Sequence, residues 1–289
     1  MGGPPWTLPL VTRGGRGAPP PVAVGGGEPP PAVPAPPPAG GPLLTGGNLQ
    51  HDGHLVGFVN GQAWSYPPGT PLSQIAGVRP SDPNRPVTQT IIYVNGILND
   101  TDDHFQSLQA IADDAGAEVI GVYNASENAG MDLLQCIGDK ADLGHNPAVD
   151  SIADAVYQQL QDTSGPINLM AHSQGGIITS RALEDVYNRL REDGMSGRDA
   201  EALMGRINVD TFGAASWTYP DGPRYNHYVN TLDPVPGFAG QTLNFFSSLF
   251  GDGSREIHRF TDASHLNTHS FTDVYLNNWQ SGFPQTGPR

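Results

Sequence analysis

Short apolar segments alternate with longer amphipathic segments over residues 88–289. The short segments are rich in β-branched residues, as buried strands are, and the longer ones repeat apolar residues at helical spacing. This alternation predicts an α/β protein with a mostly parallel sheet and helices on both faces. The predicted strands are residues 88–94, 118–123, 167–172, 207–211, 224–230 and 255–260, and the predicted helices are residues 104–115, 147–160, 176–191, 194–204 and a terminal helix that ends near residue 279.

The first 87 residues lack this pattern. Residues 1–48 contain 14 Pro and 12 Gly. This composition favours extended polyproline conformation and supplies no core, so we interpret the segment as a disordered leader or linker. Residues 49–87 are interpreted as an irregular lead-in that crosses the domain surface, with short strands near residues 55–59 or a small hairpin. The main domain is therefore expected at residues 88–289.

Residues 167–176 (INLMAHSQGG) carry the most informative motif. An apolar strand ends at Ser173, and two glycines open the next helix. A serine on such a tight turn stands out of the sheet, where a base can reach its hydroxyl, and its neighbours must be small. The layout is that of a G-x-S-x-G nucleophile elbow, with Ala171 in place of the first glycine. The alternative is that Ser173 is only a small residue in a strand-to-helix turn.

A nucleophilic serine needs a base, and the base needs an orienting carboxylate. Asp233 follows the second predicted strand after Ser173, and His269 lies in the loop after the last strand. Because parallel strands end at the same edge of a sheet, both loops are expected beside Ser173. The sequence therefore predicts Ser173 as nucleophile, His269 as base and Asp233 as acid. As an alternative, Asp233 is a turn residue that precedes a proline.

Three other histidines compete for the role of base. His265 is the main rival, because it lies four residues before His269 in the same loop. His258 falls inside a predicted strand, where it is expected to pack or to face solvent. His172 adjoins Ser173, but neighbouring side chains on an elbow point apart, so a supporting role in the turn is predicted for it.

The order Ser, Asp, His resembles that of the α/β-hydrolase superfamily, as do the segments Ala-His-Ser-Gln-Gly, Leu-Asp-Pro-Val-Pro and Thr-His-Ser-Phe. The resemblance covers about residues 88–289. It implies an α/β-hydrolase fold and serine lipase or esterase activity. It also implies an oxyanion hole formed by the backbone N–H of Gln174 and a second N–H from residues 95–97, most simply that of Ile97. This loop lacks the HGGG form, and its alternative is a plain βα turn.

A narrower resemblance concerns delivery. The Ala-His-Ser-Gln-Gly motif, the Pro/Gly-rich leader and the lack of a signal peptide are similar to those of bacterial lipase effectors and toxins, which act on phospholipids of target cells. This resemblance implies secretion by a route that needs no signal peptide, a leader that links to a delivery module, and an inhibitory immunity protein as partner. Without it, a cytoplasmic location is the expectation.

Charge and cysteine content narrow the class of partner. The net charge of −15 predicts no nucleic-acid partner and no strong attraction to anionic lipid. Cys136 is the only cysteine, which excludes an internal disulfide and a Cys-based zinc cluster. The predicted chemistry requires no metal and no cofactor.

Two segments bear on the substrate. Residues 124–146 are interpreted as a cap over the active site or as a long crossover. Residues 237–250 are rich in Phe and Leu, so they predict an acyl pocket or a transient contact with a membrane surface, or else a helix packed on the core.

These features predict hydrolysis of a carboxylic ester, with lipid or phospholipid as the favoured class, through a Ser-His-Asp triad and an acyl-enzyme. An acyltransferase or amidase with the same triad is the alternative enzyme. A non-catalytic interaction module that keeps the fold is the alternative from another class.

Overall fold

The computed structural model describes residues 39–45, 49–96, 99–125, 146–214, 216, 218–238 and 255–279. The chain divides into two units, Met1–Pro37 and Pro38–Arg289, and every described residue belongs to the second. Most of the predicted leader at residues 1–48 lies outside the described residues. Cys136 and nearly all of the two predicted substrate segments, 124–146 and 237–250, lie outside them as well.

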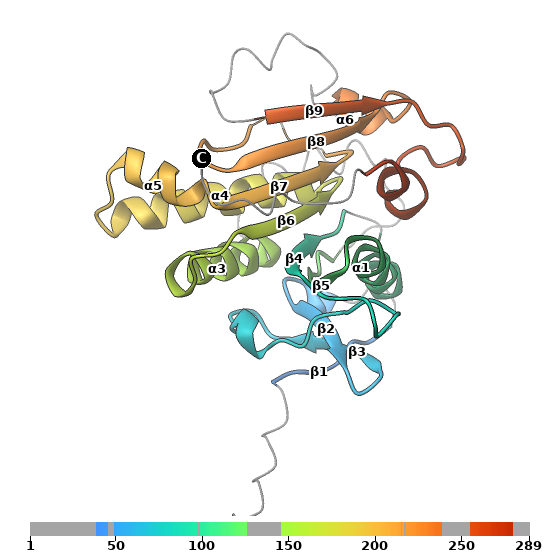
Figure 1. Ribbon diagram of the computed structural model, residues 1–289, viewed down its shortest axis with the longest axis horizontal. Coiled ribbons are helices and arrows are strands. Elements are labelled where there is room, and N and C mark those ends of the chain that lie inside the picture. The colour runs from blue at the N-terminus through green and yellow to red at the C-terminus, as the bar shows by residue number, and fades with distance from the viewer. Residues whose placement is uncertain are drawn as a thin grey trace, which may run out of the picture. The chain divides into compact units, whose positions relative to one another are not determined.

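One nine-stranded sheet forms the centre of the described part (Figure 1). Its order is β1-β3-β2-β5-β4-β6-β7-β8-β9. The last six strands in this order, which are β5, β4, β6, β7, β8 and β9, run parallel to one another. β2 is antiparallel to β5 and to β3, and β1 is antiparallel to β3. The strands are β1 Gly41–Pro42, β2 Leu55–Val59, β3 Gln62–Tyr66, β4 Gln89–Val94, β5 Ala117–Val122, β6 Ile167–His172, β7 Ile207–Phe212, β8 Arg224–Asn230 and β9 Arg255–Phe260.

Helices connect the parallel strands and begin and end at the expected signals. The Asp100 side chain caps α1 by accepting from the Asp103 N–H, and Gly116 ends this helix in a left-handed conformation. Asn146 caps α3, which opens with Pro147. The helices are α1 Thr101–Ala115, α3 Pro147–Asp162, α4 Gly175–Glu192, α5 Gly197–Met204 and α6 Pro234–Phe238, with short turns η1 Leu49–His51, η2 Leu72–Gln74, η3 Phe271–Tyr275 and η4 Leu276–Asn278.

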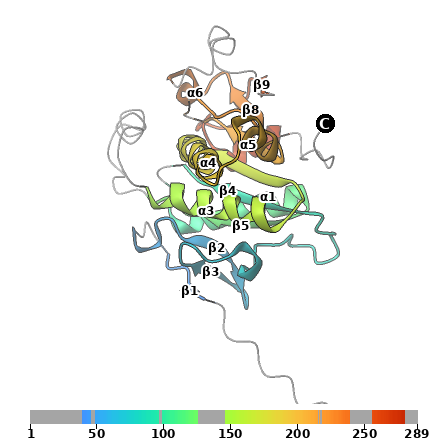
Figure 2. The ribbon, with the colours of Figure 1, turned by 90° about the vertical axis from the view of Figure 1, so that its left-hand side faces the viewer.

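Alternating side chains of the strands feed two cores on opposite faces of the sheet. Ile92 of β4 packs in the core beneath α3 and α4, whereas its neighbours Ile91 and Tyr93 pack in the core beneath α1 and η3. Figures 1 and 2 show α3 and α4 together on one side of the sheet and α1 on the other. A mostly parallel sheet covered by helices on both faces is the α/β architecture that the sequence predicted, and this prediction is confirmed.

The strand near residues 55–59 and the small hairpin that the sequence indicated are both present, because β2 pairs with β3. This hairpin extends the sheet and buries Leu55 and Tyr66 in a core, so part of the lead-in belongs to the sheet. The predicted terminal helix consists of a π-helical turn, η3, followed by a short 3₁₀ turn, η4. Trp279 ends this segment, and its Nε1–H donates to Asp210 Oδ2 at 2.7 Å, so a tertiary contact fixes the chain there.

Within these described ranges, the structure contains no helix that is both long and apolar enough to span a membrane.

Candidate active site

Ser173 lies on a strained turn between β6 and α4. Its φ is 56°, in the left-handed region that only Asn60 shares among the non-glycine residues described. A left-handed serine between a buried strand and a helix is the signature of a nucleophile elbow, because the turn pushes the side chain out of the sheet. The serine residue is 2% exposed, and its backbone N–H donates to the Phe212 carbonyl at 3.0 Å.

Close packing around the elbow explains its small residues. A Cβ on Gly175 would lie 2.6 Å from the Val94 carbonyl oxygen, and one on Gly96 would lie 2.6 Å from Ser173 Cβ. Ala171, at the position of the first motif glycine, is fully buried in the sheet. The β4 loop therefore passes directly against the serine, and glycine at position 96 is what lets the backbone approach.

Asp233 and His269 come together, as the sequence predicted. Asp233 Oδ2 accepts from His269 Nδ1 at 2.6 Å and from the Tyr275 hydroxyl at 2.5 Å, and Asp233 Oδ1 accepts from the Val235 N–H at 2.9 Å. The Asp233 side chain is fully buried and that of His269 is 13% exposed. Three donors thus hold one carboxylate, and the bond from Nδ1 leaves Nε2 on the far side of the imidazole ring.

Tyr275 is a residue that sequence reasoning missed. Burial and the neighbouring Asp233 carboxylate raise the pKa of Tyr275 well above its ordinary value, so its hydroxyl stays protonated and donates. In the sequence, Tyr275 is one of several aromatic residues in a predicted helix. No local spacing distinguishes it, because its contact with Asp233 spans 42 residues.

His172 connects the elbow to the segment that carries His269. Its Nε2–H donates to the His269 backbone carbonyl at 3.0 Å, and the two imidazole rings pack with centroids 4.7 Å apart. Burial, with a smaller contribution from His269, holds the pKa of His172 well below its usual range, so this ring is neutral. His172 is therefore bonded to the loop that carries His269, across 97 residues of sequence.

Ser173 Oγ and His269 Nε2 do not hydrogen-bond to each other. In the part of the chain that the structure describes, both atoms are buried and neither has a hydrogen-bond partner. A buried hydroxyl and a buried ring nitrogen are costly to leave unsatisfied, so free capacity of this kind marks functional sites. Catalytic hydrogen bonds are often loose in unliganded enzymes.

The rival histidines lie elsewhere. His265 has a side chain that is 47% exposed, and its Nε2 lies 3.8 Å from the Asp273 carboxylate. His258 stacks on Tyr228 with ring centroids 4.6 Å apart. Asp233 is thus bonded to His269, which favours His269 over His265 as the partner of the acid.

The predicted oxyanion residues are only partly described. Gln174 is 3% exposed at the start of α4, where helix N–H groups and the helix dipole favour negative charge. Its side-chain Oε1 accepts from Asn124 Nδ2 at 2.8 Å. Ile97 lies outside the described residues, whereas Gly96 of the same loop is described and lies against Ser173.

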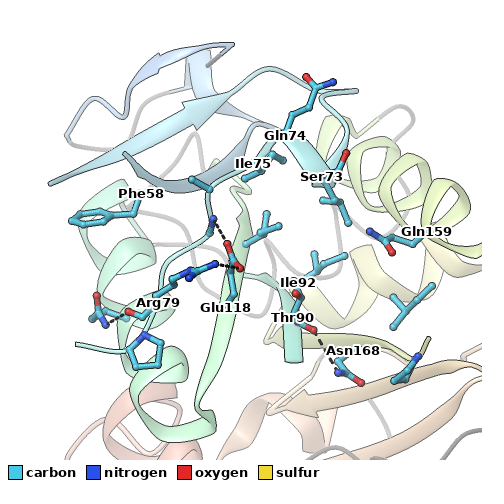
Figure 3. A pocket seen from close by; sticks show the side chains of 18 of the residues that line it. Phe58, Ser73, Gln74, Ile75, Arg79, Thr90, Ile92, Glu118, Gln159 and Asn168 are labelled. Carbon is cyan, nitrogen blue, oxygen red and sulfur yellow. Dashed lines mark hydrogen bonds and ion pairs between the residues drawn. The ribbon is translucent and has the colours of Figure 1, made fainter. Parts of the chain in front are cut away.

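A cavity of about 1030 Å³ lies at the other end of the strands (Figure 3). Its lining includes the second residue of each of three strands, which are Thr90, Glu118 and Asn168. The apolar side chains of Ile92 and Ile120 line it as well. The cavity contains none of the predicted site residues. In the described ranges, no group of three or more His, Cys, Asp or Glu side chains is placed to hold a metal ion.

No protein-family model matches the sequence, and no curated protein matches it either. Among solved structures, the chain is similar to a hormone-sensitive lipase from a metagenome library, with 13% identity, a TM-score of 0.44, and coverage of 68% of this chain and 77% of that one. It is also similar to esterase B from Lactobacillus rhamnosis, with 12% identity, a TM-score of 0.43, and coverage of 70% and 74%. A third is carboxyl esterase 2 from the mycorrhizal fungus Tuber melanosporum, with 11% identity, a TM-score of 0.41, and coverage of 71% and 75%. The likeness concerns the fold alone.

Proposed function

We propose that the protein is a serine hydrolase that cleaves carboxylic esters with Ser173, His269 and Asp233 as its triad. The observation that carries the proposal is the 2.6 Å hydrogen bond between His269 Nδ1 and Asp233 Oδ2, at the same sheet edge as a buried serine in a left-handed turn. A carboxylate bonded to Nδ1 fixes the tautomer whose Nε2 accepts a proton.

In the proposed reaction, Ser173 Oγ attacks the ester carbonyl carbon while its proton passes to His269 Nε2. The new oxyanion accepts a hydrogen bond from the Gln174 N–H and one from the β4 loop, for which we propose Ile97. The C–O bond then breaks, and the imidazolium gives its proton to the departing alcohol. Water attacks the acyl-enzyme by the same route, which releases the acid and restores Ser173.

We further propose lipid or another apolar ester as the substrate class. Leu232 and Leu266 are 46% and 104% exposed, and they flank Asp233 and His269 in sequence. The Thr268 hydroxyl donates to the Leu232 carbonyl at 3.2 Å, so the two loops lie next to each other. Two exposed leucines on adjoining loops suit contact with a lipid surface.

The test of the triad combines labelling with turnover. A fluorophosphonate probe should label the wild type, and p-nitrophenyl esters should be hydrolysed. Ser173→Ala and His269→Ala should abolish both, whereas His265→Ala, the matched change in the same loop, should retain them. Retained activity in His269→Ala would overturn the base assignment. An unlabelled and inactive wild type would favour the non-catalytic module.

The substrate proposal has its own test. Changing Leu232 and Leu266 together to Ser should lower hydrolysis of phospholipid vesicles at least several-fold and leave a soluble short-chain ester unaffected. Equal loss on both substrates would contradict a lipid-surface role. Product analysis with added alcohol or amine acceptors separates a hydrolase from an acyltransferase or amidase, because a transferase forms the new ester or amide in preference to the acid.

The delivery proposal rests on the sequence alone. If the protein is an effector that attacks phospholipids of target cells, its expression in the periplasm of a bacterial host should slow growth, and Ser173→Ala should remove the effect. Unimpaired growth at an equal protein level would contradict toxicity, and with it the need for an immunity protein.

A further inference from the structure

We infer that Asn124 is a positioning residue that fixes the Gln174 end of the oxyanion hole against the β4 loop. The inference rests on the proposed function and deepens it. Three neighbouring parallel strands, β5, β4 and β6, are each followed within two residues by a buried amide: Asn124, Asn95 and Gln174. Their exposed fractions are 1%, 0% and 3%.

Asn124 and Asn95 bind each other in both directions. The Asn124 backbone N–H donates to Asn95 Oδ1 at 2.9 Å, and Asn95 Nδ2 donates to the Asn124 carbonyl at 3.0 Å. Asn95 Nδ2 also donates to the Gly96 carbonyl at 2.8 Å. These bonds fix the path of the β4 loop through Gly96, whose backbone lies against Ser173.

One further bond joins this pair to the elbow. Asn124 Nδ2 donates to Gln174 Oε1 at 2.8 Å, and it links segments 50 residues apart. Gln174 is the residue after the nucleophile, and its backbone N–H is the proposed oxyanion donor. A bond to its side chain therefore limits how far that N–H can turn from the reacting carbonyl, which is the kind of support that a precise site requires.

The chemistry of the network suits its place. Burying three amides is costly unless each is hydrogen-bonded, and a satisfied network selects one arrangement. All three side chains are neutral, so they add no charge beside a developing oxyanion. A carboxylate at position 124 would oppose that oxyanion in a region shielded from water.

The test uses the two ends of one bond. Asn124→Ala and Gln174→Met each remove it, and both keep the backbone N–H of residue 174. Each variant should lower kcat for p-nitrophenyl acetate by roughly 10-fold to 100-fold and change KM little. This decrease in kcat is no larger than the one caused by removing an oxyanion donor itself. Since both changes delete one interaction, the double variant should be little worse than either single variant.

Replacing the substrate carbonyl by a thiocarbonyl gives a readout that belongs to the oxyanion hole. Sulfur is larger and a weaker hydrogen-bond acceptor, so a well-formed hole prefers the oxygen ester. The ratio of kcat/KM for the oxygen ester to that for the thionoester should fall in both variants. A ratio equal to that of the wild type in both variants would overturn the inference, even if kcat falls.

Asn208→Ala is the matched control. Asn208 is 4% exposed, and its Nδ2 donates to Asn168 Oδ1 at 2.9 Å near the opposite end of β6 and β7. Asn208→Ala should lower the melting temperature about as much as Asn124→Ala does, but it should leave both kcat and the ratio of oxygen-ester to thionoester turnover unchanged. If Asn124→Ala fails to fold, the nearly isosteric Gln174→Met decides the outcome. An inactive wild type would overturn the proposed function and this inference together, whereas an active wild type with unchanged ratios in the variants would overturn the inference alone.

Discussion

The two ends of the parallel strands differ in what they bring together. The amino ends of β4, β5 and β6 border the cavity of about 1030 Å³, where Glu118 accepts from the Gly77 N–H and pairs with Arg79 (Figure 3). The carboxyl ends carry Ser173 and, on loops after β8 and β9, Asp233 and His269. The cavity thus lies at one end, and the proposed nucleophile Ser173 and the bonded Asp233–His269 pair lie at the other.

The two ends also differ in how their polar groups are bonded. At the amino ends, Glu118 accepts from the Gly77 N–H, and Asn168 Nδ2 donates to the Thr90 carbonyl. The residues that line the cavity include no histidine and no cysteine. At the carboxyl ends, Ser173 Oγ and His269 Nε2 have no partner among the described residues. Loops after parallel strands converge on that edge, and the start of α4 adds a helix dipole, so reactive side chains gather there.

The largest expected contrast in activity is between variants of Asp233, at the carboxyl ends of the strands, and Glu118, at the amino ends. Asp233→Asn should lower kcat/KM for p-nitrophenyl esters by roughly 10³-fold to 10⁴-fold, because an amide no longer fixes the imidazole tautomer. Glu118→Gln, at the cavity, should change it by less than about twofold, since this residue contacts no reacting group. Similar losses in the two variants would assign the amino end a part in the reaction.

A pair of glycines gives the next largest contrast. Gly96→Ala places a methyl group 2.6 Å from Ser173 Cβ, so the loop or the serine must move. Displacement of about 1 Å in a reacting group costs roughly 10²-fold in rate. Gly165 precedes β6 at the amino end and has open space around its Cβ position, so Gly165→Ala should retain wild-type turnover. Full activity in Gly96→Ala would show that the loop does not constrain the nucleophile.

His104, a buried histidine of α1, is expected to make the free energy of unfolding depend on pH. His104 of α1 stacks on Tyr93, and a Cβ on Gly121 would lie 2.2 Å from its Nε2. Burial lowers the pKa of His104 to about 3 from 6.5, and neither ring nitrogen has a partner in the described residues. Between these pH values His104 is protonated in the unfolded chain and neutral in the folded chain. The contribution of neutral His104 to stability is therefore fully present above pH 6.5 and is lost as the pH falls toward 3.

Protonation of this histidine on unfolding should lower the free energy of unfolding by about 1.4 kcal/mol per pH unit, or about 2 kcal/mol between pH 6.5 and 5. Urea unfolding of the wild type and of His104→Leu at pH 7 and pH 5 measures it. The wild type should lose about that much more free energy of unfolding than the variant. An equal pH dependence in the two proteins would show that His104 is not the source.

The smallest contrast concerns two tyrosines. Tyr275→Phe removes a donor from Asp233 Oδ2 and should lower kcat roughly 10-fold, in line with one hydrogen bond to a charged group. Tyr225→Phe, which removes a bond to the Pro220 carbonyl near the amino end of β8, should leave kcat unchanged. Wild-type kcat in Tyr275→Phe would leave Tyr275 with a packing role alone.

The sequence by itself determined the features that depend on neighbouring residues. Strands β8 and β9 have the predicted bounds, because short segments of alternating side chains form strands in many contexts. The turn at Ser173 was also readable, since small residues after an apolar run leave the chain few other conformations. From these elements the fold class and the common edge of the candidate residues follow.

Only the tertiary structure decided which distant groups meet. His265 and His269 look alike in sequence, and the bond to Asp233, 36 residues away, distinguishes them. The donation from Tyr275 and the link between Asn124 and Gln174 were unreadable for the same reason, with separations of 42 and 50 residues. Local patterns set which elements form, but hydrogen bonds between loops depend on how the twisted sheet places their ends, and that is a property of the whole folded chain.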